Sequence, residues 1–274
     1  MNDYTFGNRL CDLRRRAGLT QAELAEKLGI TNKAVSKWEN GRAKPTTDLI
    51  RKLAALYGVK VEELLREREG EKKMEITKIV ITGGPCAGKT TAMNWIQGHL
   101  DRLGYKVLFV PETATELITG GVAPWTCGTN ALYQECQVEL QLTKERLFVQ
   151  AARTMPKEKI LIVCDRGGMD NWAYMNEEES QQVLNALNLT KEEILGRYEA
   201  VFHLETAARG IQNAYTLANN GARIETPAQA VELDDRTRAA WQAHPRHRVI
   251  RSGEDFVEKM RSLIREVEAF LDEA

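Results

Sequence analysis

Residues 83–91 combine glycines, a lysine and two threonines at a spacing suited to phosphate binding. They fit the pattern G-x-x-x-x-G-K-[ST], which binds nucleotide phosphates when it joins a strand to a helix. We expect the whole loop to contact the nucleotide: Gly83, Gly84, Pro85, Cys86, Ala87, Gly88, Lys89, Thr90 and Thr91. A solvent-facing Lys89 is expected to reach the β- and γ-phosphates, and the hydroxyl of Thr90 is expected to bind Mg²⁺. The sequence therefore predicts ATP and Mg²⁺ as cofactors.

Three further side chains with catalytic potential follow apolar segments. Glu112 comes after residues 106–110, and Asp165 and Arg166 come after residues 160–164. Asp165 suits a magnesium ion, and Arg166 in place of a water-activating glutamate favours transfer to a bound acceptor over hydrolysis. We expect Glu112 one strand over from the phosphate loop, as the base for an acceptor hydroxyl. The alternatives are a helix-capping or solvent-facing carboxylate for Glu112 and a turn aspartate for Asp165.

Two arginines and several aromatic residues could complete such a site. Arg209 and Arg223 could close over the triphosphate and stabilise the transferred charge, or they could be exposed loop residues. Trp125 and Tyr133, in residues 120–136, could sandwich a planar acceptor or pack on the helix expected near residues 130–154. Trp172 and Tyr174, just past Asp165 and Arg166, are similar candidates. The four histidines lack the spacing of metal ligands.

Short β-branched runs position these residues. They occur at residues 76–82, 106–110, 160–164, 200–204 and 248–250 and alternate with helical stretches. This alternation predicts a doubly wound parallel sheet with helices on both faces. Ligands of such sheets bind at the carboxyl ends of the strands. Gly83, Glu112 and Asp165 all fall at such ends, so distant residues are expected to form one site.

The chain before residue 67 reads as five helices, so the overall fold class is α followed by α/β. The helices are expected near residues 5–17, 21–28, 31–39, 47–57 and 61–66. Thr20 and Glu23 form the capping pattern of the second helix, and Gly29 suits the turn after it. Leu24, Val35 and Trp38 are expected in a shared core.

Residues 21–40 resemble the helix-turn-helix of the Cro/phage-repressor (XRE) family, and the resemblance covers about residues 4–66. It implies binding of double-stranded operator DNA by a homodimer, with one helix in the major groove. Polar residues on or beside that helix are the candidate DNA contacts: Gln21 and Thr31 for phosphates, Asn32, Lys33 and Ser36 for base edges, Lys37, Arg42 and Lys44 for the backbone, and Asn40 on the outer face. The alternative is a small protein-binding module with a solvated basic face.

Charge divides the chain in the same way. Residues 1–73 hold 16 Lys and Arg against 11 Asp and Glu, a balance of +5, so the overall charge of −1 leaves the remainder at −6. We therefore predict a helix-turn-helix domain over 1–66, a linker over 67–75 and a nucleotide-binding domain over 76–274. No apolar run is longer than that of residues 160–164, which is too short to span a membrane. Five scattered cysteines without a CxxC pair favour a cytoplasmic protein.

Residues 74–274 resemble P-loop kinase domains of the nicotinamide-riboside-kinase and deoxynucleoside-kinase kind. The matching segments are the phosphate loop and residues 110–115, 164–167 and 203–206. The resemblance implies a base role for Glu112 and a phosphate or acceptor contact for Arg166. Three functions remain open: a regulator that phosphorylates a small metabolite, a regulator that senses nucleotide without turnover, and a defence- or toxin-associated ATPase.

Overall fold

The computed structural model describes residues 4–65, 75–209, 226–253 and 255–273. The chain separates into two compact units, Met1–Lys72 and Lys73–Ala274, and each is described by itself. Within the described residues, no helix has the length and apolar character needed to cross a membrane.

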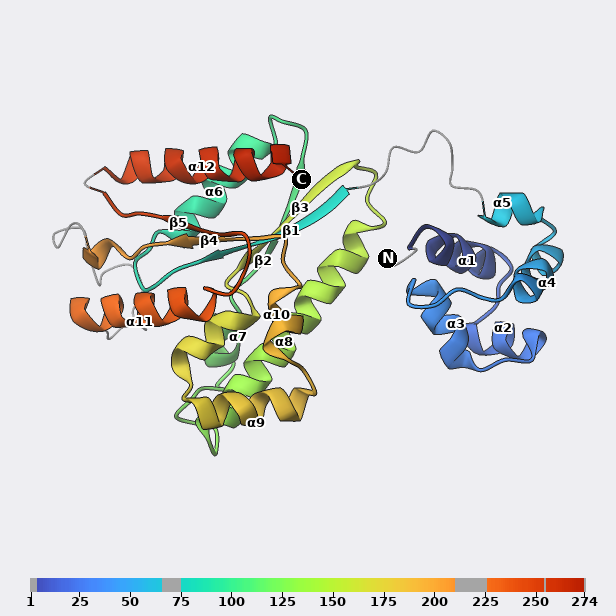
Figure 1. Cartoon of the computed structure of the whole chain (residues 1–274), viewed down its shortest axis with the longest axis horizontal. Coiled ribbons are helices and arrows are strands. Elements are labelled where there is room, and N and C mark those ends of the chain that lie inside the picture. The colour runs from blue at the N-terminus through green and yellow to red at the C-terminus, as the bar shows by residue number, and fades with distance from the viewer. Residues whose placement is uncertain (1–3, 66–74, 210–225, 254, 274) are drawn as a thin grey trace. The chain divides into compact units, whose positions relative to one another are not determined.

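The first unit consists of five helices (Figure 1): α1 (Tyr4–Arg16), α2 (Gln21–Leu28), α3 (Asn32–Glu39), α4 (Thr47–Tyr57) and α5 (Val61–Leu65). The predicted capping box is confirmed, because Thr20 and Glu23 each bind the other's backbone N–H. Gly29 ends α2 in the left-handed conformation, with φ of 66°. The expected core is also confirmed, since Leu24, Val35 and Trp38 are buried together with residues of α1, α4 and α5.

A buried ion pair joins α1 to the C-terminal end of α3. The Arg14 guanidinium donates through Nε to Glu39 Oε1 at 2.6 Å and through Nη2 to Oε2 at 2.9 Å. Gln21 donates to the same carboxylate at 2.8 Å, and Arg14 also donates to the Leu19 carbonyl at 2.7 Å. These contacts connect α1, α2 and α3 and hold the two helices of the turn in a fixed geometry.

The second unit is built on a five-stranded, all-parallel sheet. Its strands are β1 (Glu75–Thr82), β2 (Lys106–Val110), β3 (Lys159–Asp165), β4 (Ala200–Leu204) and β5 (His247–Ile250), in the order β2-β3-β1-β4-β5. β1 is the central strand, paired in parallel with β3 on one side and β4 on the other. The strand order reverses beside β1, so the predicted doubly wound sheet is confirmed.

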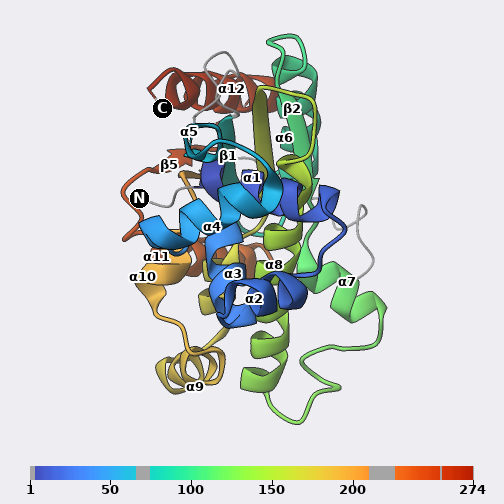
Figure 2. The ribbon, with the colours of Figure 1, turned by 90° about the vertical axis from the view of Figure 1, so that its right-hand side faces the viewer.

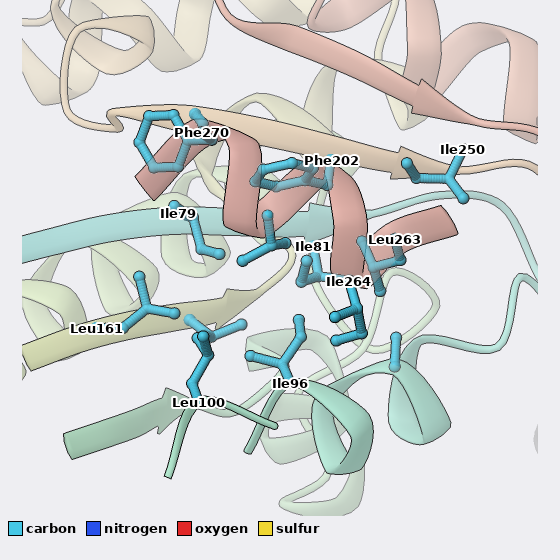
Figure 3. Packing of buried hydrophobic residues seen from close by; sticks show 14 of the residues in the cluster. Ile79, Ile81, Ile96, Leu100, Leu161, Phe202, Ile250, Leu263, Ile264 and Phe270 are labelled. Carbon is cyan, nitrogen blue, oxygen red and sulfur yellow. The ribbon is translucent and has the colours of Figure 1, made fainter. Parts of the chain in front are cut away.

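Helices cover both faces of this sheet. On one face α6 (Lys89–Leu100) and α12 (Phe256–Glu273) bury the side chains of β1 and β4; Figure 3 shows Ile96, Leu100 and Phe270 packed against Ile79 and Phe202. The other face is covered by α8 (Asn130–Ala152), α10 (Lys191–Leu195) and the segment around Trp241. Both faces of β1 are therefore buried from Thr77 to Thr82, which explains the apolar run of residues 79–81 in the middle of the strand.

The remaining elements surround the carboxyl ends of the strands. They are α7 (Thr113–Thr119), the 3₁₀ helix η1 (Gly168–Tyr174), α9 (Glu177–Leu187), the 3₁₀ turn η2 (Ala207–Arg209) and α11 (Pro227–Ala240). α9 contacts α8 and lies beside one end of that helix in both views of the ribbon (Figures 1 and 2). η1 packs against α8, α10 and α11, so the segment after β3 is fixed from several sides.

Candidate functional site

The predicted phosphate loop joins β1 to the N-terminus of α6, the context that this motif requires. Gly83 has φ of 141°, and a Cβ atom there would lie 2.1 Å from the Leu204 carbonyl oxygen. Gly88 has φ of 89°, and a Cβ atom there would lie 2.8 Å from the Phe256 ring. Glycine is therefore required at both ends of the loop, both for its backbone conformation and for its lack of a side chain.

The carbonyl groups of the loop are held from outside. Thr206 Oγ1 donates to the Pro85 carbonyl at 2.5 Å, the Ala207 N–H to the Cys86 carbonyl at 3.4 Å, and Lys259 Nζ to the Ala87 carbonyl at 2.9 Å. In a trans peptide the C=O and the next N–H point in opposite directions. Anchoring these three carbonyls outwards therefore directs the following N–H groups towards the interior of the loop, where a phosphate would bind.

Lys89 differs from the expectation of a solvent-facing side chain. It is only 8% exposed. Burial and the charge of Arg166 lower the pKa of its ammonium, while Asp165, Glu112 and Asp170 oppose the shift. The expectation was wrong because it considered only the loop and its helix, and charged residues that follow β2 and β3 close over the lysine.

Asp165 lies at the end of β3, with one carboxylate oxygen, Oδ1, buried and without a hydrogen-bond partner. Burial raises the pKa of this carboxyl, Lys89 and Arg166 lower it, and Glu112 and Asp170 raise it further. An unsatisfied carboxylate oxygen beside a phosphate loop fits a hard cation such as Mg²⁺. Thr90 is exposed in the first turn of α6 and offers a hydroxyl. In the described part of the chain, no cluster of three or more His, Cys, Asp or Glu side chains could hold a metal ion, so phosphate oxygens would have to complete the coordination.

Arg166 connects the ends of β2 and β3. Its Nε donates to Glu112 Oε1 at 2.6 Å and its Nη1 to Asp170 Oδ1 at 3.0 Å. Asp170 is 1% exposed and also accepts the Gly167 N–H at 2.9 Å and the Trp241 Nε1–H at 3.1 Å. The guanidinium is thus held between two carboxylates, with the second carboxylate itself fixed by buried donors.

Glu112 and Asp165 sit in opposite electrostatic environments. Burial alone would raise the pKa of Glu112, but Arg166 and Lys89, with hydrogen bonds from Thr115 and Arg166, lower it to about 2. Glu112 is therefore ionised and weakly basic in this arrangement. It also lies two strands from β1, because β3 stands between β2 and β1; the expectation of one strand was wrong. After β2 at the edge of the sheet, the chain crosses back, and β3 is inserted between β2 and β1.

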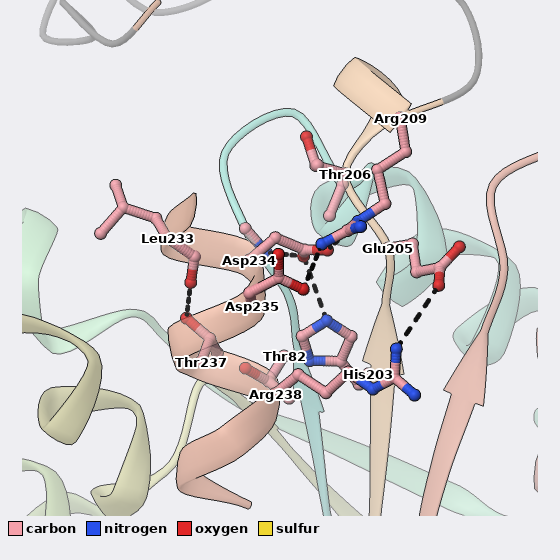
Figure 4. A network of polar contacts seen from close by, with 12 residues as sticks. Thr82, His203, Glu205, Thr206, Arg209, Leu233, Asp234, Asp235, Thr237 and Arg238 are labelled. Atoms are coloured by element: carbon pink, nitrogen blue, oxygen red, sulfur yellow. Dashed lines mark hydrogen bonds and ion pairs between the residues drawn. The ribbon is translucent and has the colours of Figure 1, made fainter. Parts of the chain in front are cut away.

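Arg209, the first of the two arginines expected above the triphosphate, is bound by α11 (Figure 4). Its Nε donates to Asp234 Oδ2 at 3.1 Å, and its Nη2 contacts Asp235. Asp234 also accepts the Gly84 N–H at 2.8 Å and contacts His203 Nε2 at 3.1 Å. To reach a phosphate, Arg209 would have to give up its contacts with Asp234 and Asp235. The second arginine, Arg223, lies outside the described residues.

The aromatic candidates divide into buried and exposed residues. Tyr133 is 2% exposed on α8, whereas Trp125 is 76% exposed in the preceding loop. Burial raises the pKa of Tyr133 to about 12, and the charges of Cys127, Glu112 and Tyr174 add to the shift. Trp172 packs against two clusters of buried side chains. Packing on α8 and η1 therefore accounts for Tyr133 and Trp172, while Trp125 remains available to a ligand.

The candidate DNA contacts occupy one side of α3 and its flanks. Asn32, Lys33 and Lys37 are exposed, as are Thr31, Asn40, Arg42 and Lys44, while Ser36 and Gln21 are half-buried. Several of these side chains already have partners in the domain. Thr31 Oγ1 accepts the Ala34 N–H at 3.2 Å, Asn40 donates to the Ser36 carbonyl at 2.8 Å, and Gln21 donates to Glu39.

Three residues that the sequence analysis did not select proved central to the arrangement: Asp170, Asp234 and Lys259. Asp234 and Lys259 each occupy a buried helix position among residues that pack inwards, Asp234 between Ala230 and Thr237 and Lys259 four residues before Leu263. A charged residue within a buried stripe of a helix is the signal that could have identified both.

Comparison with known proteins agrees with this division of the chain. A protein family described as "AAA domain" matches residues 78–259, and one described as "Helix-turn-helix" matches residues 12–64. The chain belongs to this AAA domain family. Its first unit is a helix-turn-helix domain, as the resemblance to the XRE family predicted.

Curated relatives named as HTH-type transcriptional regulators match part of the chain. The HTH-type transcriptional regulator ImmR of Bacillus subtilis (strain 168) is 44% identical over 71 residues, 26% of this chain and 56% of that protein. The HTH-type transcriptional activator BcrR of Enterococcus faecalis is 30% identical over 112 residues, 39% of this chain and 48% of that protein. This chain thus spans about half the length of each. A crystal structure of the restriction-modification controller protein C.AhdI from Aeromonas hydrophila is 34% identical and covers 22% of this chain and 92% of its own, with a TM-score of 0.21 that carries no structural argument.

Proposed function

We propose that this protein is a cytoplasmic, dimeric, DNA-binding transcriptional regulator whose AAA domain binds Mg²⁺·ATP and phosphorylates a hydroxyl group of a small metabolite. The DNA-binding part is supported by the helix-turn-helix match and by the exposed polar side chains Asn32, Lys33 and Lys37 on α3. The names of ImmR and BcrR as transcriptional regulators support the same role. α3 would enter the major groove, with the Arg14–Glu39 pair holding it against α1.

The observation that carries the nucleotide part is the convergence of Lys89, Asp165 and Arg166 at the carboxyl ends of β1 and β3. The phosphate loop supplies inward-directed N–H groups, and Lys89 supplies a positive charge whose burial removes competing water. Bound Mg²⁺, held by Asp165, Thr90 and phosphate oxygens, would neutralise charge on the β- and γ-phosphates.

Phosphoryl transfer is supported by the position of Arg166 directly after Asp165, between the carboxylates of Glu112 and Asp170. The acceptor oxygen would attack the γ-phosphorus, the bond to the β–γ bridging oxygen would break, and ADP would leave. Arg166, held by Glu112 and Asp170, would stabilise the transferred charge. Glu112 would accept the acceptor proton, with an effect at the low end of the usual range because its pKa is about 2.

The same pKa favours a second candidate, a regulator that senses nucleotide without turnover. A carboxylate that is ionised and paired with Arg166 accepts a proton poorly, so ATP could occupy the loop and alter DNA affinity without reacting. One experiment separates the two functions. The pure protein is incubated with ATP, Mg²⁺ and a library of nucleosides and vitamins, and the products are analysed by mass spectrometry. A phosphorylated product supports the kinase, whereas ATP binding without product supports the sensor.

A further inference from the structure

Lys259 is a buried lysine that connects three parts of the second unit. It lies in the first turn of α12 and is 5% exposed. Its Nζ donates to the Ala87 carbonyl at 2.9 Å, the Glu205 carbonyl at 2.5 Å and the Ser252 hydroxyl at 3.0 Å. An ammonium group has three N–H donors, and all three have acceptors here, whereas a neutral amine could satisfy only two.

One of these acceptors belongs to the phosphate loop. The Ala87 carbonyl and the Gly88 N–H are the two ends of one trans peptide, so a donor that holds the carbonyl on the α12 side directs the N–H to the opposite side. Gly88 is the last residue before Lys89 and lies against Phe256, one turn before Lys259 on α12. The first turn of α12 therefore fixes the orientation of the final peptide of the loop.

We propose that Lys259 is a positioning residue for the nucleotide: in its charged form it orients the Ala87–Gly88 peptide towards the phosphates, and nucleotide affinity therefore depends on its protonation. This inference rests on the proposed nucleotide-binding function. The residue does not touch the nucleotide in this account, since its three donors are directed at protein oxygens.

The environment of Lys259 makes this dependence measurable near neutral pH. Burial lowers the pKa of the ammonium to about 8, against the opposing charges of Asp234 on α11 and Glu205 at the end of β4. Arg238 of α11 lies 4.0 Å from Glu205 and offsets part of that negative charge. A bound triphosphate adds negative charge nearby and raises the pKa again, so binding above pH 8 takes up a proton.

The sign of the pH effect follows from this shift. The pKa is higher with nucleotide bound than without it, so affinity is full below about pH 8 and falls as the pH rises above it. One linked proton weakens binding by up to tenfold per pH unit, so the dissociation constant should rise about 10- to 30-fold from pH 7.0 to 9.5. The phosphates of ATP are ionised throughout this range and add no slope.

The test measures the dissociation constant of Mg²⁺·ATP for the full chain at pH 7.0 to 9.5 by calorimetry. Lys259→Met keeps the length of the side chain without its charge, and it should bind about 10- to 100-fold more weakly at pH 7.0, with a flat profile. Lys259→Arg stays charged throughout and should retain binding with a flat profile. Lys106→Met removes a lysine charge from the start of β2, at the opposite ends of the strands from the loop, and should keep the wild-type slope.

Two results would overturn the inference. The first is a dissociation constant that does not change with pH in the wild-type protein, which would show that no linked proton exists; this measurement does not depend on any variant folding. The second is a pH dependence that persists in Lys259→Arg, which would assign the linked proton to another group. Either result leaves the proposed nucleotide binding intact. No binding by the wild-type protein at any pH would instead reject the proposed function and this inference with it.

Discussion

Replacing Glu112 by glutamine tests the ion pair with Arg166 without knowledge of any acceptor. The pKa of Glu112 falls from 4.5 to about 2 in the folded protein. That difference corresponds to about 3 kcal/mol of unfolding free energy at neutral pH. Glutamine can still accept one hydrogen bond from Arg166, so we expect Glu112→Gln to lose about 1–3 kcal/mol at pH 7.

The pH dependence follows from the direction of the shift. A carboxyl group with a depressed folded pKa stabilises the protein above its unfolded pKa of 4.5, and this contribution disappears as the pH falls towards 2. The difference between wild type and Glu112→Gln should therefore shrink by about 1 kcal/mol between pH 5 and 3.5. Urea unfolding at a series of pH values measures this difference directly.

Glu116→Gln is the matched control. Glu116 lies on α7, the helix that begins directly after Glu112, and pairs with Lys144 at 2.6 Å, but its side chain is 44% exposed. An exposed pair contributes about 0–1 kcal/mol. If the two variants lose the same small amount at pH 7, or if the deficit of Glu112→Gln does not change with pH, the strong coupling between Glu112 and Arg166 is refuted.

Three further predictions concern DNA binding, turnover and the helix-turn-helix core. Lys37→Ala or Arg42→Ala should weaken DNA binding evenly across sequences and flatten the dependence of log affinity on log salt concentration by about one. Asn32→Ala or Lys33→Ala should instead change the sequence preference. Fluorescence anisotropy at several salt concentrations measures both effects. Once an acceptor is known, Glu112→Gln should lower kcat about 10²-fold and leave the Kd for ATP unchanged, whereas Asp165→Asn should impair both turnover and ATP binding. Unchanged turnover in Glu112→Gln would exclude Glu112 as the base. Glu39→Gln leaves Arg14 buried without its counter-charge and should destabilise the first unit by about 3–5 kcal/mol. Hydrogen exchange of the full chain should then be faster in peptides from α1–α3, and unchanged slow exchange in those peptides would contradict this prediction.

Local sequence patterns predicted the elements of both units well. The capping box of Thr20 and Glu23, the left-handed Gly29 and the phosphate loop each depend on residues within a few positions of one another. Such features are encoded in short segments, so their geometry follows from spacing and residue type. The five strands were found for the same reason, because buried parallel strands need apolar β-branched runs.

Long-range contacts account for what the sequence analysis missed. Lys259 is 172 residues from its acceptor Ala87, and Asp234 is 150 residues from Gly84. No local pattern connects such pairs, and only the packing of α11 and α12 brings them to the loop. The burial of Lys89 and the position of Glu112 two strands away were mispredicted because both depend on β3 lying between β1 and β2.

Nucleotide binding through the phosphate loop is the central claim, and calorimetry of the full chain with Mg²⁺·ATP tests it most directly. Wild-type protein should bind, and Lys89→Ala should abolish or greatly weaken binding while the protein stays folded, because the lysine supplies phosphate contact. Lys106→Ala removes the same charge from the start of β2, at the opposite ends of the strands from the loop, and should bind as wild type does. Equal ATP affinity in Lys89→Ala and wild-type protein would contradict the assignment of the loop.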